Sequence, residues 1–518
     1  MTTSSIHMSR QLLMGELIRR SAHKAPDLLA FVYEEERITY QELEKNTLHL
    51  AGWLQEKGTR IGEKVGIISK NNLAFVEIIF GIALSGGVSV PINFRLVPEE
   101  FVYIINNSDT KILFIEEEYE DVIQSILPKL SSIEQIVVIG KPKLKNMIAY
   151  GSIFQTETTY RSIHEHVSDD DDCMICYTSG TTGYPKGAVL SHKNLLMSAL
   201  NSVVDSKIDR GNKQLVVTPL FHIAGIGNIL ITCTVGGTTF IHHEFNPVKV
   251  LNTIHKEKID GLFLVPAMWN IVMQVPHIDD YDLTSVVRCS TGAAICPIEI
   301  KEKIMQYFPN AGIFDAFGQT EMSPTTTCLL PQDSLRKTNS VGKPVLNVEV
   351  RVVDDNMNDV PIGEIGEIVY RGPTLMKGYY KNPDATKESF KGGWFHSGDL
   401  VRMDDEGFIY VVDRKKDMII SGGENIYPAE VEAALYKHGD ILEAAVIGVP
   451  DQEWGESVKA YVVLKKGKVL TEEEIIQHCK EQIASYKKPK FVEFLHELPR
   501  NPSGKILKRV LRDVSHVK

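Results

Sequence analysis

The sequence has few cysteines, and their pattern does not suit disulfide bonding. Seven cysteines occur in 518 residues, whereas small secreted domains use an even and dense set. Cys173 and Cys176 have the spacing of a redox or zinc pair, but no second pair follows at the spacing of a zinc finger. We therefore interpret both as structural thiols, and we expect a reducing, cytoplasmic location.

Long apolar runs and a basic excess are also lacking. No uninterrupted apolar run reaches the roughly 18 residues that a membrane-spanning helix needs, and the first residues lack the apolar core of a signal peptide. We expect no transmembrane segment, and we leave peripheral membrane contact open. The net charge is −11, and binding to a phosphate backbone needs a concentrated basic face. Nucleic acid is therefore excluded as the main partner.

The hydrophobic pattern alternates between amphipathic helices and short apolar strands. A chain of 518 residues is too long for one compact core, so we expect two or more domains. The predicted helices are Gln41–Gln55, Asn71–Leu84 and Pro98–Asn107. The predicted strands are Val65–Ser69, Val88–Pro91, Lys111–Ile115, Cys173–Tyr177, Gln214–Thr218, Gly261–Val265 and Val286–Ser290. This alternation predicts a parallel, helix-covered α/β sheet with its ligands beyond the carboxyl ends of the strands. Residues 348–370 are rich in strand-forming residues and predict a small β-subdomain.

The most informative segment is Tyr177-Thr-Ser-Gly-Thr-Thr-Gly-Tyr-Pro-Lys-Gly187, directly after a predicted strand. Its glycines let the backbone approach an anion, its amides and hydroxyls can donate to phosphate oxygens, and its lysine supplies positive charge. The residues that we assign to phosphate binding are Thr178, Ser179, Gly180, Thr181, Thr182, Gly183 and Lys186. The segment Tyr177–Gly187 is not a Walker A loop, which needs Gly-Lys-Ser/Thr, so an ordinary P-loop NTPase is disfavoured.

With this loop and the blocks that follow it in order, the chain resembles the adenylate-forming superfamily, which includes acyl-CoA synthetases and aryl-CoA ligases. The further blocks are Ser290-Thr-Gly-Ala-Ala294, Asp315-Ala-Phe-Gly-Gln-Thr-Glu321, Gly366–Gly372, Trp394–Asp399, Asp413–Asn425 and Pro499–Lys505. The resemblance covers roughly residues 35–508. It implies a large N-terminal α/β body of several sheets with a small β-rich subdomain (1–414) and a small, mobile α+β lid (415–518).

The resemblance also implies the reaction and the nucleotide site. The enzyme would use ATP, Mg²⁺ and coenzyme A to convert a small-molecule carboxylic acid into an acyl-adenylate and then a thioester. Glu321 would bind Mg²⁺, Thr320 would contact the α-phosphate, and Asp399 and Arg414 would bind the ribose. The residues implied on the adenine side are Gly292, Ala293, Ala294, Asp315, Phe317 and Gly318. A non-catalytic relative would be expected to have lost some of these groups, and all of them are present.

The lid would supply groups to each of the two half-reactions. By the same resemblance, Lys505 bridges the acid and the α-phosphate during adenylation, and Lys416 lies at the hinge. Ser421, Gly422 and Gly423 would line the tunnel for the thiol of coenzyme A. A flexible cation suits the task of Lys505, because it must enter for one half-reaction and leave for the other.

The block Pro219–Gly225 resembles the border between the acyl pocket and the thiol tunnel, with His222 as an aromatic gate. Ala224, Gly225 and Gly227 are small and predict a slot for an alkyl chain. We therefore expect a medium- or long-chain fatty acid as the substrate. An aryl acid of the benzoate or cinnamate type is the alternative, and a stand-alone enzyme that loads a carrier protein is a further one. Nothing in the sequence marks a luciferase-type oxidase.

Overall fold

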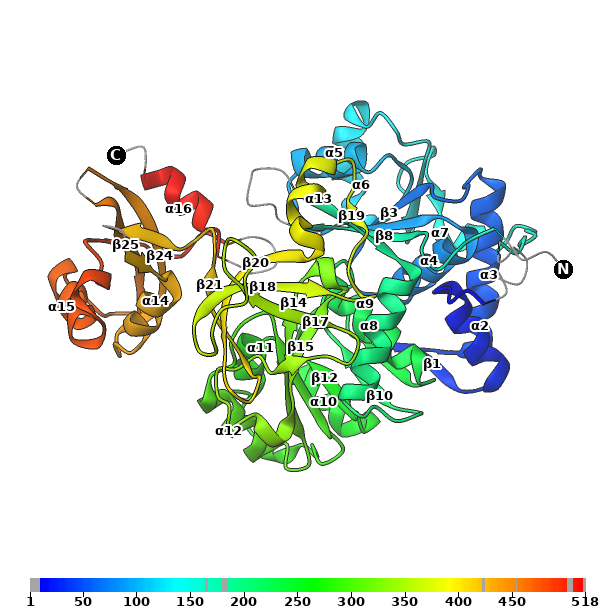
Figure 1. The fold of residues 1–518 in the computed structure, drawn as a ribbon. Helices are drawn as coiled ribbons and strands as arrows, with labels where there is room; N and C mark the ends of the chain where they lie inside the picture. Colours follow the sequence, from blue (N-terminus) through cyan, green and yellow to red (C-terminus); the bar gives the residue numbers. More distant parts are fainter. Residues whose placement is uncertain are drawn as a thin grey trace. The chain divides into compact units, whose positions relative to one another are not determined.

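The computed structural model describes residues 10–163, 166–178, 185–421, 424–452, 454–500 and 506–515. The chain forms two compact units, one of residues 1–350 and 370–395 and the other of residues 351–369 and 396–518. Figure 1 shows the chain coloured from blue at the N-terminus to red at the C-terminus. The division predicted after Arg414 falls inside the second unit, and it stays a prediction about where a mobile lid begins.

The first unit contains two large sheets. The nine-stranded sheet has the order β16 (Lys343–Pro344), β15 (Thr325–Leu329), β14 (Gly312–Gly318), β13 (Arg288–Gly292), β12 (Gly261–Phe263), β10 (Lys213–Val216), β11 (Thr238–Ile241), β1 (Leu29–Tyr33) and β2 (Glu36–Thr39). The eight-stranded sheet has the order β19 (Gly378–Tyr379), β9 (Lys186–Ser191), β8 (Asp172–Thr178), β4 (Val88–Pro91), β3 (Lys64–Ile68), β5 (Thr110–Glu116), β6 (Gln135–Ile139) and β7 (Ile148–Ala149).

Helices pack between these two sheets and cover their faces (Figure 1). The helix α4 packs against β4 of one sheet and β1 of the other, and α8 packs against β8 and β15. The helices of this unit are α2 (Gly15–Lys24), α3 (Tyr40–Glu56), α4 (Leu73–Ser85), α5 (Pro98–Asn107), α6 (Glu120–Ile126), α7 (Tyr150–Ile153), α8 (His192–Asp205), α9 (Ile223–Thr234), α10 (Pro247–Glu257), α11 (Pro266–Val272), α12 (Ile298–Tyr307) and α13 (Pro383–Ser389). The predicted α/β architecture is therefore confirmed.

Local sequence signals explain where several of these elements begin and end. At the start of α3, Thr39 and Glu42 form a capping box, in which each side chain accepts a hydrogen bond from the other residue's backbone N–H. Asn72 caps α4 through a hydrogen bond from Phe75 N–H, and Gly86 ends that helix at a φ of 87°. The predicted helix over Asn71–Leu84 therefore includes its own capping residue.

The predicted parallel pairing is confirmed only in part, because five pairs among the described strands of the two large sheets are antiparallel: β1–β2, β14–β15, β15–β16, β8–β9 and β9–β19. In the pairs β8–β9 and β14–β15 only a short loop joins the strands, whereas a parallel connection needs a crossover of a dozen or more residues. The remaining neighbours along β10, β12, β13 and β14 are parallel, so their carboxyl ends share one edge of the sheet.

The second unit has two smaller sheets. The four-stranded sheet, most of which lies in this unit, has the order β17 (Glu349–Val353), β18 (Ile365–Arg371), β20 (Phe395–Met403) and β21 (Ile409–Arg414), which confirms the predicted β-rich stretch. The five-stranded sheet contains β23 (Glu424–Ile426), β22 (Ile419–Ser421), β25 (Gly455–Leu464) and β24 (Ile441–Asp451) in that order, with β26 (Phe491–Phe494) also paired to β25. Its helices are α14 (Pro428–Tyr436), α15 (Glu472–Gln482) and α16 (Lys508–Ser515).

All seven cysteines are free thiols. Burial raises the pKa of the Cys176 thiol to about 12, so this side chain is a protonated, unreactive group at neutral pH. Cys173 and Cys176 are both buried, which agrees with the interpretation of both as structural thiols. Among the residues that the structure describes, no helix is long and apolar enough to cross a membrane.

Candidate active site

The signature loop joins two neighbouring antiparallel strands. Thr178 ends β8, Lys186 begins β9, and the two residues are paired across the strands. Ser179, Gly180, Thr181, Thr182 and Gly183, which were predicted to bind phosphate, lie outside the described residues. The Thr178 hydroxyl donates to the backbone oxygen of Lys186 over 3.4 Å. The strands therefore fix both ends of the predicted phosphate loop.

The predicted adenine-side residues lie at the carboxyl ends of β13 and β14. Gly292 is paired with Ala316 across the two strands, and a Cβ at Gly292 would lie 2.5 Å from the Ala316 oxygen. Gly318 is equally constrained, because a Cβ there would lie 1.9 Å from the oxygen of Pro324. Both glycines are therefore required by close backbone approaches at this edge of the sheet.

Three further adenine-side residues lie beside these glycines. Ala293 and Ala294 are exposed, and Phe317 is half-buried. Ala293 has a φ of 65°, which is the left-handed region that a residue with a Cβ seldom adopts. Strain of this kind clusters at ligand-binding sites. Its position, one residue after a strand at the shared carboxyl edge, agrees with the predicted role of this loop.

Asp315 forms an ion pair within the protein interior. The ammonium of Lys301, on α12, lies 2.6 Å from Asp315 Oδ2 and also donates to the Ser334 oxygen over 3.1 Å. Lys301 is only 1% exposed. Burial raises the pKa of Asp315, and the neighbouring ammonium opposes that rise. The other carboxylate oxygen, Oδ1, is buried and has no hydrogen-bond partner. It is therefore a buried acceptor for which the described residues supply no donor.

Glu321, predicted to bind Mg²⁺, is 7% exposed and follows Thr320 in a short 3₁₀ turn (Thr320–Met322). Its Oε1 accepts a hydrogen bond from the Tyr379 hydroxyl over 2.8 Å. Among the described residues, no lysine or arginine forms an ion pair with Glu321. A nearly buried carboxylate without a counter-ion is unfavourable unless a cation compensates it, and carboxylate oxygens are ligands that Mg²⁺ prefers. The residue therefore fits a metal-binding role.

His222 caps the N-terminus of α9, and its Nδ1 accepts a hydrogen bond from Ala224 N–H over 3.2 Å. The ring is exposed, yet the surrounding protein lowers its pKa by desolvation. The lowered pKa favours the neutral imidazole at neutral pH, and the gate role of His222 stays a prediction.

The three residues predicted to line the acyl slot differ in the space around them. A Cβ at Gly225 would lie 2.4 Å from the oxygen of Pro219, so this glycine is required by the packing of α9. A Cβ at Gly227 would meet only Cδ of Pro324, at an ordinary 3.5 Å. Gly227 and Ala224 are both partly exposed, whereas Gly225 is buried. The structure therefore has room for a side chain at Gly227 and gives Gly225 a separate, packing role.

In the second unit, the two predicted ribose-binding residues are partners. Asp399 on β20 and Arg414 on β21 are paired across the strands, and Arg414 Nε lies 2.7 Å from Asp399 Oδ1. Asp399 is 3% exposed, so the guanidinium keeps a buried carboxylate compensated. The pair places a carboxylate and a cation side by side, a combination that can bind a diol.

The hinge and tunnel residues of the second unit are only partly described. Lys416 lies in a turn closed by a hydrogen bond from Asp417 N–H to the Arg414 oxygen over 2.9 Å. Ser421 ends β22 and is paired with Glu424 of β23. Gly422 and Gly423 lie outside the described residues, and so does Lys505.

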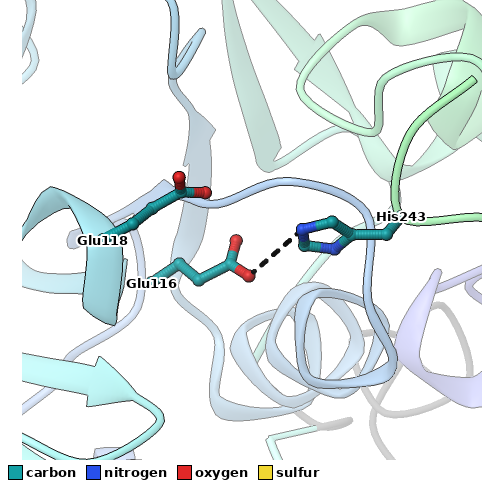
Figure 2. Close-up of side chains that lie close together, drawn as sticks. All are labelled: Glu116, Glu118 and His243. Atoms are coloured by element: carbon teal, nitrogen blue, oxygen red, sulfur yellow. Dashed lines mark ion pairs between the residues drawn. The ribbon is translucent and has the colours of Figure 1, made fainter.

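Another group of ionisable side chains lies at the carboxyl ends of strands in the first unit. Figure 2 shows Glu116, Glu118 and His243 close together, with His243 Nε2 3.7 Å from Glu116 Oε1. The Lys70 ammonium lies 3.1 Å from Glu118 and 2.9 Å from Glu244. Because Lys70 compensates Glu118 and Glu244, and His243 lies beside Glu116, we interpret the group as an ion-pair network that connects the two large sheets.

Lys301 and Tyr379 are two residues of this site that the sequence patterns did not indicate. Lys301 stands in an amphipathic helix three residues before the buried Ile304. A lysine on the apolar face of a helix indicates a buried charge that needs a partner. Tyr379 belongs to a strand of two residues, which is too short for any periodicity to indicate.

Comparison with known proteins agrees with this geometry. The family described as AMP-binding enzyme matches residues 18–380, and the family described as AMP-binding enzyme C-terminal domain matches residues 430–505. The chain is 36% identical to a feruloyl-CoA synthase of Amycolatopsis sp. over 96% of this chain and 98% of that protein. It is 33% identical to the long-chain-fatty-acid–CoA ligase FadD13 of Mycobacterium tuberculosis, over 96% of this chain and 98% of the ligase.

Solved structures with bound nucleotides are also similar. The o-succinylbenzoate CoA synthetase MenE of Bacillus subtilis, in complex with ATP and magnesium ion, matches with a TM-score of 0.86 at 29% identity, over 96% of this chain and 99% of that one. The same enzyme in complex with its acyl-adenylate intermediate OSB-AMP matches with a TM-score of 0.85 at 29% identity, over 96% and 98% of the two chains.

Proposed function

Because the chain belongs to the AMP-binding enzyme family and is an acyl-CoA synthetase of the acyl- or aryl-CoA ligase class, we propose that its substrate is a medium- or long-chain fatty acid. In the first half-reaction the acid's carboxylate attacks the α-phosphorus of ATP, and pyrophosphate leaves. In the second, the thiol of coenzyme A attacks the acyl carbonyl, and AMP leaves. Both ATP and the acid are anions, so the first step depends on charge compensation more than on proton transfer.

The first unit would supply that compensation. Lys186 and the loop that begins at Thr178 would hold the phosphates, and Thr320 would contact the α-phosphate. Glu321 would hold Mg²⁺, which when bound would neutralise phosphate charge. Asp315 Oδ1, buried and without a partner, would accept a hydrogen bond from the adenine amino group, and Phe317 would lie against the ring. The residues of the second unit, Asp399 and Arg414, would bind the ribose.

The choice of a fatty acid is carried by the free space beside Gly227. Because glycine carries no side chain, we place the slot for the alkyl chain at this position of α9. The similarity to the long-chain-fatty-acid–CoA ligase supports the same class. A cytoplasmic location also belongs to this proposal, since all seven cysteines are free thiols.

An aryl acid is a second candidate, and the similarity to feruloyl-CoA synthase favours it. A flat ring can occupy the same slot by stacking. The two candidates differ in how activity depends on chain length. Only an alkyl acid buries an additional methylene with each step of a homologous series.

We expect catalytic efficiency to rise about fourfold for each added CH₂ along a series of straight-chain acids, because a fully buried methylene contributes about 0.8 kcal/mol. The rise should stop where the chain reaches the end of the slot. The measurement is pyrophosphate release with acids from acetate to palmitate, beside benzoate and cinnamate. A clear optimum at an aryl acid, with no rise along the alkyl series, would show that the substrate is aromatic.

Two substitutions in α9 test where the proposed slot for the alkyl chain lies. Gly227→Leu should fill the free space and lower activity most for the longest acids, and it should not destabilise the fold because leucine has the higher helix propensity. Ala224→Tyr should also penalise long acids, and it should admit a flat ring by stacking. The control is Gly225→Ala, which should lower the melting temperature, because its methyl group has no room. An unchanged chain-length profile in Gly227→Leu would place the slot elsewhere.

We also expect Lys416→Pro to leave acyl-adenylate formation nearly intact and to slow thioester formation on the order of 10²-fold, the usual cost of misplacing reacting groups. Proline fixes φ near −65° and restricts the preceding residue, so it should hinder a rotation at the predicted hinge. The measurements are single-turnover adenylation and coenzyme A-dependent product formation. Lys416→Ala is the control, since it removes the same ammonium and keeps the backbone free. Thioester formation at the parent rate in Lys416→Pro would place the hinge elsewhere.

A further inference from the structure

A single tyrosine contacts both charged groups that the proposed function assigns to the phosphates and the metal. The hydroxyl of Tyr379 donates to Glu321 Oε1 over 2.8 Å. On the other side, the Lys186 ammonium lies 5.2 Å from the centre of the Tyr379 ring. One side chain thus contacts an anion through its hydroxyl and a cation through its aromatic face.

Strand pairing and a hydrogen bond hold the backbone of Tyr379 in place. Its strand β19 pairs with β9, the strand that carries Lys186, with Tyr379 opposite Ala188. Tyr379 N–H donates to the Thr386 hydroxyl over 2.9 Å. The preceding Gly378 has a φ of 152°, and a Cβ there would lie 2.8 Å from Thr386. The ring therefore extends from a backbone that is fixed on both sides.

We propose that Tyr379 is a positioning residue that holds Glu321 for Mg²⁺ and Lys186 for the phosphates of ATP. This inference rests on the proposed function, which assigns those two roles. The hydroxyl fixes one oxygen of the carboxylate, and the other oxygen stays available to the metal. The ring restricts the Lys186 side chain, which would otherwise lose rotamer freedom when ATP binds.

The two contacts have separable effects. A hydrogen bond to a charged group stabilises its orientation and contributes more than a neutral one. A cation over an aromatic ring is attracted by the negative face of the ring. Removal of the hydroxyl alone should therefore disturb the metal, whereas removal of the whole ring should also disturb the lysine and the phosphates.

The test is calorimetric titration of the full-length protein with α,β-methylene-ATP, which lacks the cleavable bond, across a range of Mg²⁺ concentrations and in EDTA. Tyr379→Phe should raise the Mg²⁺ concentration at half-saturation about tenfold, as for one hydrogen bond to a charged group, and leave binding in EDTA unchanged. Tyr379→Leu should show the same rise and, in addition, weaken binding in EDTA about two- to fivefold, as expected for one exposed cation–π contact.

Tyr380→Phe is the matched control. Its hydroxyl also donates to a carboxylate, that of Asp109, over 2.9 Å, so the substitution removes the same kind of hydrogen bond from the adjacent residue. It should leave the Mg²⁺ dependence at the parent value. Lys186→Ala should weaken binding both with Mg²⁺ and in EDTA, because it removes a phosphate contact and no metal contact.

The outcomes separate this inference from the proposed function. If the parent protein binds the analogue and Tyr379→Phe keeps the parent Mg²⁺ dependence, or shifts it no more than Tyr380→Phe does, Tyr379 is structural and the inference is wrong. If Tyr379→Phe weakens binding equally with Mg²⁺ and in EDTA, its hydroxyl does not act through the metal, and the inference is again wrong. A parent that binds no analogue at any Mg²⁺ concentration overturns the proposed function as well.

Discussion

Lys505→Ala is expected to slow acyl-adenylate formation by about 10²–10³ and to leave thioester formation from supplied acyl-adenylate near the parent rate. The first half-reaction brings two anions together, and loss of one preorganised charge contact typically costs that much. The second half-reaction involves a neutral acyl carbonyl and a thiol, for which this cation has no predicted task. Single-turnover formation of the adenylate and, separately, conversion of synthetic acyl-adenylate with coenzyme A measure the two steps.

Arg509→Ala is the control for this prediction. Arg509 lies four residues further along the chain, is exposed, and carries the same charge. It should therefore change neither half-reaction. Equal slowing of both steps by Lys505→Ala would contradict a role confined to adenylation and would indicate that the lysine supports the fold of its unit.

The sequence predicts the strands and helices well where one physical signal dominates. The strand Val88–Pro91 and the helix Pro98–Asn107 have their predicted bounds, because Gly86-Gly87 precede the strand and a proline begins the helix. The antiparallel partners β9 and β15 were not expected from alternation alone. Strand direction depends on the connection, and the loops that lead into β9 and β15 are both too short for a parallel crossover, but their length is known only once the bounds of both strands are known.

The candidate site is predictable only as far as the motif blocks reach. Thr178, Lys186 and Glu321 stand in contiguous motifs: Thr178 ends β8, Lys186 begins β9, and Glu321 lies in the 3₁₀ turn that follows β14. Tyr379 was missed because its contact with Glu321 joins residues 58 positions apart in the sequence. Such a contact arises from the pairing of β19 with β9, and a two-residue strand leaves no periodic signal.

Gly225 shows how one residue type can have two explanations. A row of small residues along α9 suggests a slot, but the structure separates a glycine that packing requires from one that leaves space. In the sequence Gly225 and Gly227 are the same residue type and cannot be told apart. Only the distance from a hypothetical Cβ to its neighbours distinguishes them, and that distance depends on the position of Pro219 and Pro324.

Lys301→Met is expected to lower the free energy of unfolding by about 3–5 kcal/mol, the usual cost of leaving one partner of a buried ion pair without the other. Methionine keeps the length and apolar volume of the side chain, so the loss would come from the charge. Asp315 would keep a buried carboxylate with no ammonium beside Oδ2, and its Oδ1 already lacks a partner. The measurement is the denaturant midpoint of the first unit's transition, followed by circular dichroism.

The free energy of unfolding that Lys301→Met loses is expected to depend on pH. Burial already raises the pKa of Asp315, and removal of Lys301 should raise it further. In the unfolded chain the pKa of an Asp is near 3.9, so Asp315 loses its proton there at a lower pH than in the folded variant. Stability therefore falls as pH rises from the unfolded pKa to the folded pKa of Asp315. The difference between Lys301→Met and the parent should therefore be smaller at pH 5 than at pH 8. A difference that is independent of pH would show that lost packing, and not the carboxylate, destabilises the variant.

A double variant separates the stability of this pair from its proposed role toward ATP. Replacing both partners of a buried ion pair by apolar residues of similar size is often neutral or stabilising, so Lys301→Met with Asp315→Leu should recover most of the loss. The same variant lacks the acceptor that we assign to the adenine amino group, so it should bind ATP weakly despite its restored stability. If the double variant is stable and binds ATP as the parent does, Asp315 serves the fold alone, and the adenine amino group is recognised elsewhere.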